Sequence, residues 1–96
     1  MTIPLSSTFS VSQEVLSQEV SGETVLLDMQ SESYFGLDEV GTRIWQLLQE
    51  KHSLQEVFDV MLEEYEVEEK QLEKDLNELL NKLIDEELVT IMSVAR

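Results

Sequence analysis

With 96 residues and a mass of 11.1 kDa, the chain is large enough for one small hydrophobic core and too small for a two-domain enzyme. Six basic against 21 acidic side chains give a net charge of −15, which repels phosphate backbones and anionic lipid headgroups. We therefore expect neither nucleic acid nor a membrane surface as a partner.

The chain contains no cysteine, which excludes disulfides and thiolate metal sites and fits a reducing compartment. The segment from Met1 to Ser12 lacks the basic and apolar regions of a signal peptide, and no apolar run approaches the roughly 18 residues of a membrane span. We expect a cytoplasmic protein with a single domain over residues 1–96, in which residues 1–8 are flexible.

The first third of the chain predicts an antiparallel sheet of three strands. Val15 to Val20 and Thr24 to Met29 are rich in β-branched and aliphatic residues, and a Gly-containing connection joins them, which is typical of a hairpin. After a polar turn, Ser33 to Leu37 predicts a short aromatic strand. Phe9 to Val11 is interpreted as an extension of the first strand.

The remainder predicts three helices. Asp38 is a suitable N-cap for a helix from about Glu39 to Glu50, and Ser53 with Glu56 forms a capping box for a second helix. A leucine-rich stripe then indicates a third helix from about Glu68 to Glu86. For Leu88 to Met92 both a closing strand and a helical tail remain open. The predicted fold class is α+β, with a three-stranded antiparallel sheet followed by three helices.

A catalytic site is not supported by the residue inventory. His52 is the only histidine and cannot build a triad or a histidine metal centre, so we interpret it as a surface residue before the Ser53 cap. The acidic segment lacks the Gly-containing pattern of a calcium loop, and no glycine-rich phosphate loop is present. We expect no catalytic residues, no cofactor and no metal.

Three helices with a sheet also describe a winged helix-turn-helix, but the charge of the third helix argues against DNA binding. This helix carries seven acidic side chains against three lysines. The concentration of acids from Asp59 to Glu78 has two interpretations, a solvated helix face or a surface that attracts a basic partner.

The strand from Ser33 to Leu37 is the one feature that suggests binding. It is the last strand of the predicted sheet and carries no Lys or Pro to block pairing, so an extended peptide can add to it. The alternative is that Tyr34 and Phe35 both pack and the edge is covered. For an open edge we expect one of these two aromatics in the core, the other in a groove, and an outward N–H at Ser33, Phe35 or Leu37.

Four segments occur in a distinctive order: Val25 to Met29, the stretch YFGLDEVGTRIW with the helix it begins, Ser53 to Val57, and the Glu/Lys/Asp/Leu-rich third helix. In this combination the sequence resembles the PqqD family, and the resemblance covers roughly residues 9–92. The YFGLDEVGTRIW stretch is similar to the stand-alone leader-binding proteins of lasso-peptide clusters. One departure is that the family commonly has a Gly before the closing aliphatic pair, where this chain has Glu86-Glu87-Leu88-Val89.

The resemblance implies a winged-helix-like domain that does not bind DNA and holds a leader peptide as a fourth strand. The peptide-binding residues it implies on the strand are Ser33, Tyr34, Phe35, Gly36 and Leu37. On the third helix they are Leu72, Asp75, Leu76, Leu79 and Lys82.

The predicted function is a non-catalytic adaptor that binds the leader region of a ribosomally made precursor peptide. It presents this peptide to a separate maturation enzyme, a protease or a modifying enzyme, and contributes effective concentration rather than bond chemistry. Two alternatives stay open, a general acidic interaction or dimerisation module that uses its helical faces, and a small enzyme that would need a bound cofactor.

Overall fold

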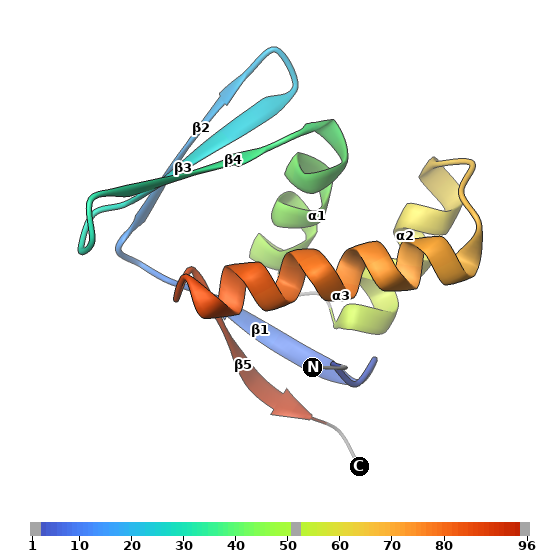
Figure 1. Ribbon diagram of the computed structural model, residues 1–96. Helices are drawn as coiled ribbons and strands as arrows, with labels where there is room; N and C mark the ends of the chain where they lie inside the picture. Colours follow the sequence, from blue (N-terminus) through green and yellow to red (C-terminus); the bar gives the residue numbers. More distant parts are fainter. Residues whose placement is uncertain (1–2, 51–52, 95–96) are drawn as a thin grey trace.

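A computed structural model of the chain describes residues 3–50 and 53–94. Two small antiparallel sheets and three helices surround one hydrophobic core (Figure 1). The strands are β1 (Ser7–Val11), β2 (Val15–Val20), β3 (Glu23–Asp28), β4 (Ser33–Leu37) and β5 (Val89–Val94), and the helices are α1 (Glu39–Gln49), α2 (Leu54–Glu64) and α3 (Glu69–Asp85). The predicted α+β, winged-helix-like class is confirmed.

Two tight turns determine the pairing register of the sheet β2-β3-β4. Ser21 and Gly22 both have positive φ, 54° and 83°, as a type I′ hairpin turn requires. In the second turn the Asp28 carboxylate accepts hydrogen bonds from the Gln30 N–H at 3.0 Å and from the Ser31 hydroxyl at 2.9 Å. These local bonds fix the register, in which Leu26 lies opposite Phe35.

The N-terminal residues do not extend β2 as expected. Phe9 to Val11 belong to a separate strand, β1, which pairs with β5, so the closing segment is a strand and not a helical tail. Of the segment expected to be flexible, residues 1–2 lie outside the described residues. Ile3 is buried in the core and donates its N–H to the Asn77 side chain on α3 at 2.9 Å.

The helices begin where their caps predict. The Asp38 carboxylate accepts a hydrogen bond from the Gly41 N–H at 2.8 Å, and the capping box of Ser53 and Glu56 is formed in both directions. His52, interpreted as a surface residue from the sequence, lies outside the described residues.

The third helix ends at Asp85 without the glycine that the resemblance implies there. Glu87 takes the left-handed conformation with φ 60°, and its N–H bonds to the Ile84 carbonyl while the Leu88 N–H bonds to the Leu83 carbonyl. This pair of hydrogen bonds is a Schellman motif, which normally uses Gly at the left-handed position. The motif turns the chain directly into β5.

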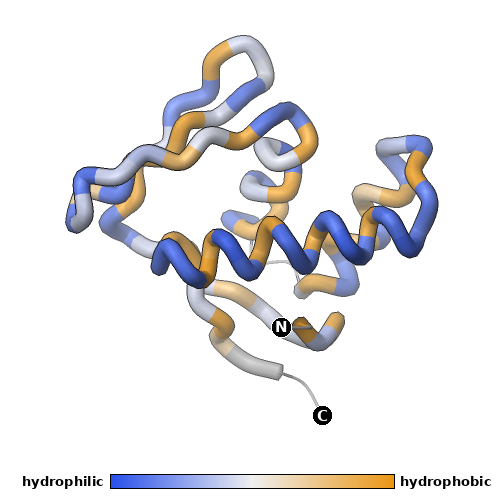
Figure 2. Tube along the Cα trace, in the orientation of Figure 1, coloured by the Kyte–Doolittle hydropathy of each residue, from blue (hydrophilic) through white to orange (hydrophobic). Residues whose placement is uncertain are grey.

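The core lies among the three helices, the sheet β1-β5 and the inner face of β2-β3-β4. Apolar and polar residues alternate along α3 (Figure 2). On α3 the buried positions are Leu72, Leu76, Leu80 and Leu83, spaced as one helix face. In the described residues no helix is long and apolar enough to cross a membrane.

Candidate peptide-binding groove

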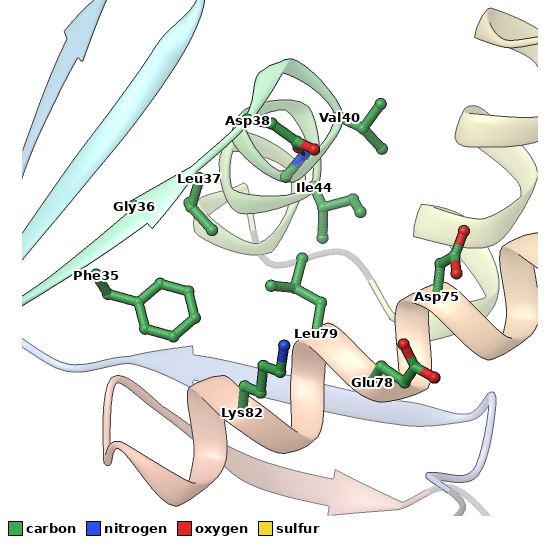
Figure 3. Close-up of a pocket in the computed structure, with 11 residues that line it drawn as sticks. Phe35, Gly36, Leu37, Asp38, Val40, Ile44, Asp75, Glu78, Leu79 and Lys82 are labelled. Carbon is green, nitrogen blue, oxygen red and sulfur yellow. Dashed lines mark hydrogen bonds between the residues drawn. The ribbon is translucent and has the colours of Figure 1, made fainter.

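A groove of about 490 Å³ lies where β4, the first turns of α1 and the middle of α3 meet (Figure 3). One wall is β4, a second is α1 with its cap, and the third is α3. The lining residues are Phe35, Gly36, Leu37, Asp38, Val40, Gly41, Ile44, Asp75, Glu78, Leu79 and Lys82.

The apolar surface of the groove comes from alternate residues of β4 and from one flank of each helix. Phe35 and Leu37 point to the inner side of the sheet, Phe35 half-buried and Leu37 buried. Ile44 from α1 and the half-buried Leu79 from α3 approach the same space (Figure 3). The groove therefore offers an apolar floor of the kind that fixes side chains of an extended peptide.

The backbone of β4 adds an open hydrogen-bonding edge to this wall. Among the described residues β4 pairs only with β3. In the type I′ hairpin Val20 and Glu23 form a hydrogen-bonded pair, and the Met29 N–H bonds to the Glu14 carbonyl, so the odd-numbered residues of β3 face β2 and the even-numbered ones face β4.

This alternation decides which groups of β4 are outward. Its residues opposite Thr24, Leu26 and Asp28 direct their backbone groups to β3, and these residues are Leu37, Phe35 and Ser33. The register therefore turns the N–H and C=O of Tyr34 and Gly36 to the open edge. The expectation of an outward N–H at Ser33, Phe35 or Leu37 is wrong by one residue.

The two aromatics also differ from the expected division into one core and one groove residue. Phe35 does both, because it packs against the core and lines the groove. Tyr34 does neither, because its side chain is on the opposite face of the sheet and is 74% exposed. Tyr34 contributes its backbone, not its ring, to the open edge.

On α3 the structure separates the five residues implied by the resemblance into two groups. Asp75, Leu79 and Lys82 line the groove, whereas Leu72 and Leu76 are buried core residues below it. On β4, Phe35, Gly36 and Leu37 line the groove, and the side chains of Ser33 and Tyr34 lie outside it.

The α1 wall was not foreseen from the sequence. Asp38, Val40, Gly41 and Ile44 line the groove, and Glu78 adds a carboxylate on α3. A signal was present, since α1 starts within two residues of the end of β4 and its first turn must lie beside that strand.

The ion pair among the described residues lies away from the groove. Arg43 contacts Glu64 with Nη2 and Oε2 2.7 Å apart, which joins α1 to α2. Hydrogen bonds from Arg43 lower the pKa of Glu64, and the same bonds raise the pKa of Arg43. The described residues contain no group of three or more His, Cys, Asp or Glu side chains arranged to hold a metal ion.

Fold and groove together define a small winged-helix-like domain with an open strand edge beside a cleft. The chain belongs to the PqqD family, described as Coenzyme PQQ synthesis protein D, which matches residues 23–89. The family resemblance inferred from the sequence is thereby confirmed. No protein with a curated description matches the chain.

Two solved structures are similar over most of the chain. One is described as "TbiB1 in Complex with the TbiA(beta) Leader Peptide", with a TM-score of 0.79 and 39% identity over 91% of this chain and 99% of that one. The other is "Lasso peptide synthetase B1 complexed with the leader peptide", with a TM-score of 0.77 and 29% identity over 85% of this chain and 96% of that one. Both similar proteins were solved with a leader peptide bound.

Proposed function

We propose that this protein is a non-catalytic adaptor that binds the leader of a precursor peptide in lasso-peptide or related biosynthesis. The leader adds to β4 as a further antiparallel strand and lies between β4 and α3. The observation that carries the proposal is the juxtaposition of the outward backbone groups of Tyr34 and Gly36 with the apolar groove beside them. The two similar structures, both complexes with leader peptides, support it.

The chemistry of β4 suits strand addition. Its five residues, SYFGL, carry no charge, so nothing on the edge repels a second backbone. Main-chain hydrogen bonds would supply affinity that does not depend on sequence, and alternate side chains of the leader would enter the groove toward Phe35 and Leu79.

An adaptor of this kind acts through proximity. By holding the leader, the domain would raise the effective concentration of the precursor at a separate maturation enzyme, a leader protease or a modifying enzyme. The groove residues contain no nucleophile paired with a base, which supports binding rather than catalysis.

The decisive experiment is a titration of the ¹⁵N-labelled domain with the leader encoded beside its gene, with the TbiA(beta) leader peptide as a second probe. We expect saturable one-to-one binding, with amide shifts at Tyr34, Gly36 and Leu79. Shifts confined to α2 would place the site elsewhere. Incubation with the full precursor should leave its mass unchanged, and cleavage or modification without an added enzyme would contradict the adaptor role.

One observation favours a second function, self-association. On the outer face of the sheet Leu16, Leu27 and Tyr34 are cross-strand neighbours, and Val20 and Val25 on the same face are exposed. An apolar sheet face of this kind can pair with a second copy. Sedimentation velocity over a concentration series, with Tyr34→Ser as the control, tests it, and a monomer at all concentrations would exclude it.

A further inference from the structure

The charged side chains of the groove are sorted by sign along α3. Asp75 and Glu78 are followed by Lys82, at spacings of three and four residues that place all three on one face of the helix. The seven residue steps from Asp75 to Lys82 correspond to about 10 Å along the helix axis. Lys82 lies at the end of the groove near Phe35, and Asp75 lies at the opposite end (Figure 3).

The negative charge at the acidic end of the groove comes from carboxylates of α3 more than from Asp38. One oxygen of Asp38 accepts the Gly41 N–H at 2.8 Å, and the positive end of the α1 dipole offsets its charge. Asp75 uses one oxygen to accept a hydrogen bond from the Gln71 amide at 2.9 Å, and both Asp75 and Glu78 are exposed. These two carboxylates are therefore placed to attract a basic side chain of a bound peptide.

Lys82 gives the opposite end its charge. In the described part of the chain the ion pair within 4.0 Å is Arg43 with Glu64, so no described carboxylate lies within that distance of the Lys82 ammonium group. In Figure 3 the Lys82 side chain extends toward the space beside Phe35 and Leu79. Lys82 is thus placed to meet an acidic side chain of the peptide.

The direction of a bound peptide follows from the arrangement of β4 and α3. The two elements run in roughly opposite directions, and the start of β4 lies near Lys82 (Figure 1, Figure 3). A peptide antiparallel to β4, the more frequent pairing in sheets, enters beside Asp75 and leaves beside Lys82. In an extended peptide every second side chain faces the groove, so two such side chains four residues apart are separated by about 14 Å. Long side chains at these two positions can reach both charged ends of the groove.

We propose that the groove selects a leader segment of the pattern basic-x-apolar-x-acidic, read from the N-terminus, and that Asp75 with Glu78 and Lys82 set its direction and register. The apolar residue enters between Phe35, Ile44 and Leu79. This inference rests on the proposed leader-binding function and adds to it the charge pattern of the peptide.

The test is a selection from a yeast-displayed library of ten randomised residues, carried out with the wild-type domain and with Lys82→Glu and Asp75→Lys. The matched controls are Lys74→Glu and Glu73→Lys, which make the same charge changes on exposed α3 residues outside the groove. Enriched peptides are then synthesised, and their Kd values are measured by fluorescence polarisation.

With the wild-type domain we expect enrichment of the basic-x-apolar-x-acidic order. The Lys82→Glu variant should change the preference at the acidic position alone, and Asp75→Lys that at the basic position alone. Each mismatch should weaken binding about two- to fivefold, the range of exposed ion pairs. The two control variants should select the same peptides as the wild type.

The outcomes separate this inference from the function on which it rests. Enrichment of apolar peptides without a charge order, or with the reverse order, overturns the inference and leaves leader binding intact. A library from which nothing is enriched over the displayed scaffold contradicts the proposed function itself. Circular dichroism and the fluorescence of the buried Trp45 confirm that each variant is folded.

Discussion

The sheet β2-β3-β4 has two edges, and they differ in what lies beside them. On β2 the positions that point to the inner side of the sheet include Ser17 and Glu19, both exposed, and Glu19 is bonded to the Gln46 amide at 3.3 Å. On β4 the corresponding positions are Phe35 and Leu37, which line the groove. Under the proposed function, an unpaired edge serves as a peptide site only where a cavity lies beside it.

The strongest way to break this comparison is a proline on each edge. Gly36→Pro removes an outward N–H of β4 and leaves the β3 ladder intact, whereas Ser17→Pro does the same on β2. We expect Gly36→Pro to weaken leader binding by about 2–3 kcal/mol, roughly 30- to 150-fold in Kd, because a backbone acceptor of the leader is left unpaired.

Two controls accompany this pair of variants. Ser17→Pro should leave the Kd unchanged, and a loss of binding there would move the leader to β2. Gly36→Ala keeps the N–H and places its Cβ in open space, with no atom within 4 Å, so it should bind like the wild type. Isothermal titration calorimetry measures all three Kd values.

The second prediction concerns the two aromatics of β4. Phe35→Ala removes a half-buried ring that also lines the groove, so we expect a loss of about 2 kcal/mol in unfolding free energy together with weaker binding. Tyr34→Ala keeps the outward backbone and should change stability by less than about 0.5 kcal/mol. Urea denaturation and leader titration measure both effects, and equal behaviour of the two variants would refute the assignment.

The third prediction uses the charge of the molecule. With a net charge of −15 and Asp75 and Glu78 in the groove, a basic leader should associate about tenfold faster at low salt than at physiological salt. Dissociation should respond little, because apolar contacts are not screened. Stopped-flow fluorescence over a salt series tests this. An association rate that does not change with salt would mean that the acidic surface contributes to solubility only.

The fourth prediction separates stability from binding. Glu87 is left-handed at the end of α3, so Glu87→Gly should raise the unfolding free energy by about 0.5–1 kcal/mol, since Gly avoids the steric cost of that conformation. Glu86→Gly removes the same charge at a residue with φ −84° and should bring no such gain. Thermal denaturation measures both, and a change in leader Kd with Glu87→Gly would link stability to binding against expectation.

The fifth prediction, with the smallest expected effect, removes the difference in charge between the two sheet edges. Replacing Glu19, the one charged residue of β2, by Val makes β2 as uncharged as β4 but creates no groove beside it. Leader affinity and a one-to-one stoichiometry should be unchanged. A second leader bound per domain would show that an uncharged edge alone is enough. Native mass spectrometry distinguishes the two results.

Local signals carried most of the prediction of the fold. Caps at Asp38 and Ser53, the Ser21-Gly22 turn and the leucine spacing of α3 are short-range features, and the structure has each of them. The pairing of β1 with β5 could not be foreseen, because strand partners distant in the chain leave no local signal. Phe9 to Val11 was accordingly assigned to the wrong strand.

The residues of the groove were also predicted only in part. Its strand wall and three residues of α3 were named, but a leucine stripe does not reveal which flank faces the sheet, and so Leu72 and Leu76 were included although they are core. The parity of outward backbone groups on β4 depends on the hydrogen-bonded pair at the Val20–Glu23 turn. A sequence without a register leaves that parity undetermined.

The pairing of β1 with β5 has a consequence for the order of folding. Ser7 lies opposite Val94, so the two-stranded sheet joins residues from almost the whole length of the chain and requires closure of a long loop. During synthesis β2-β3-β4 and the helices precede β5, so Phe9 cannot take its strand partner Ile91 until β5 has been made. The newly made domain can therefore assemble all three walls of its groove, β4, α1 and α3, before β1 is paired.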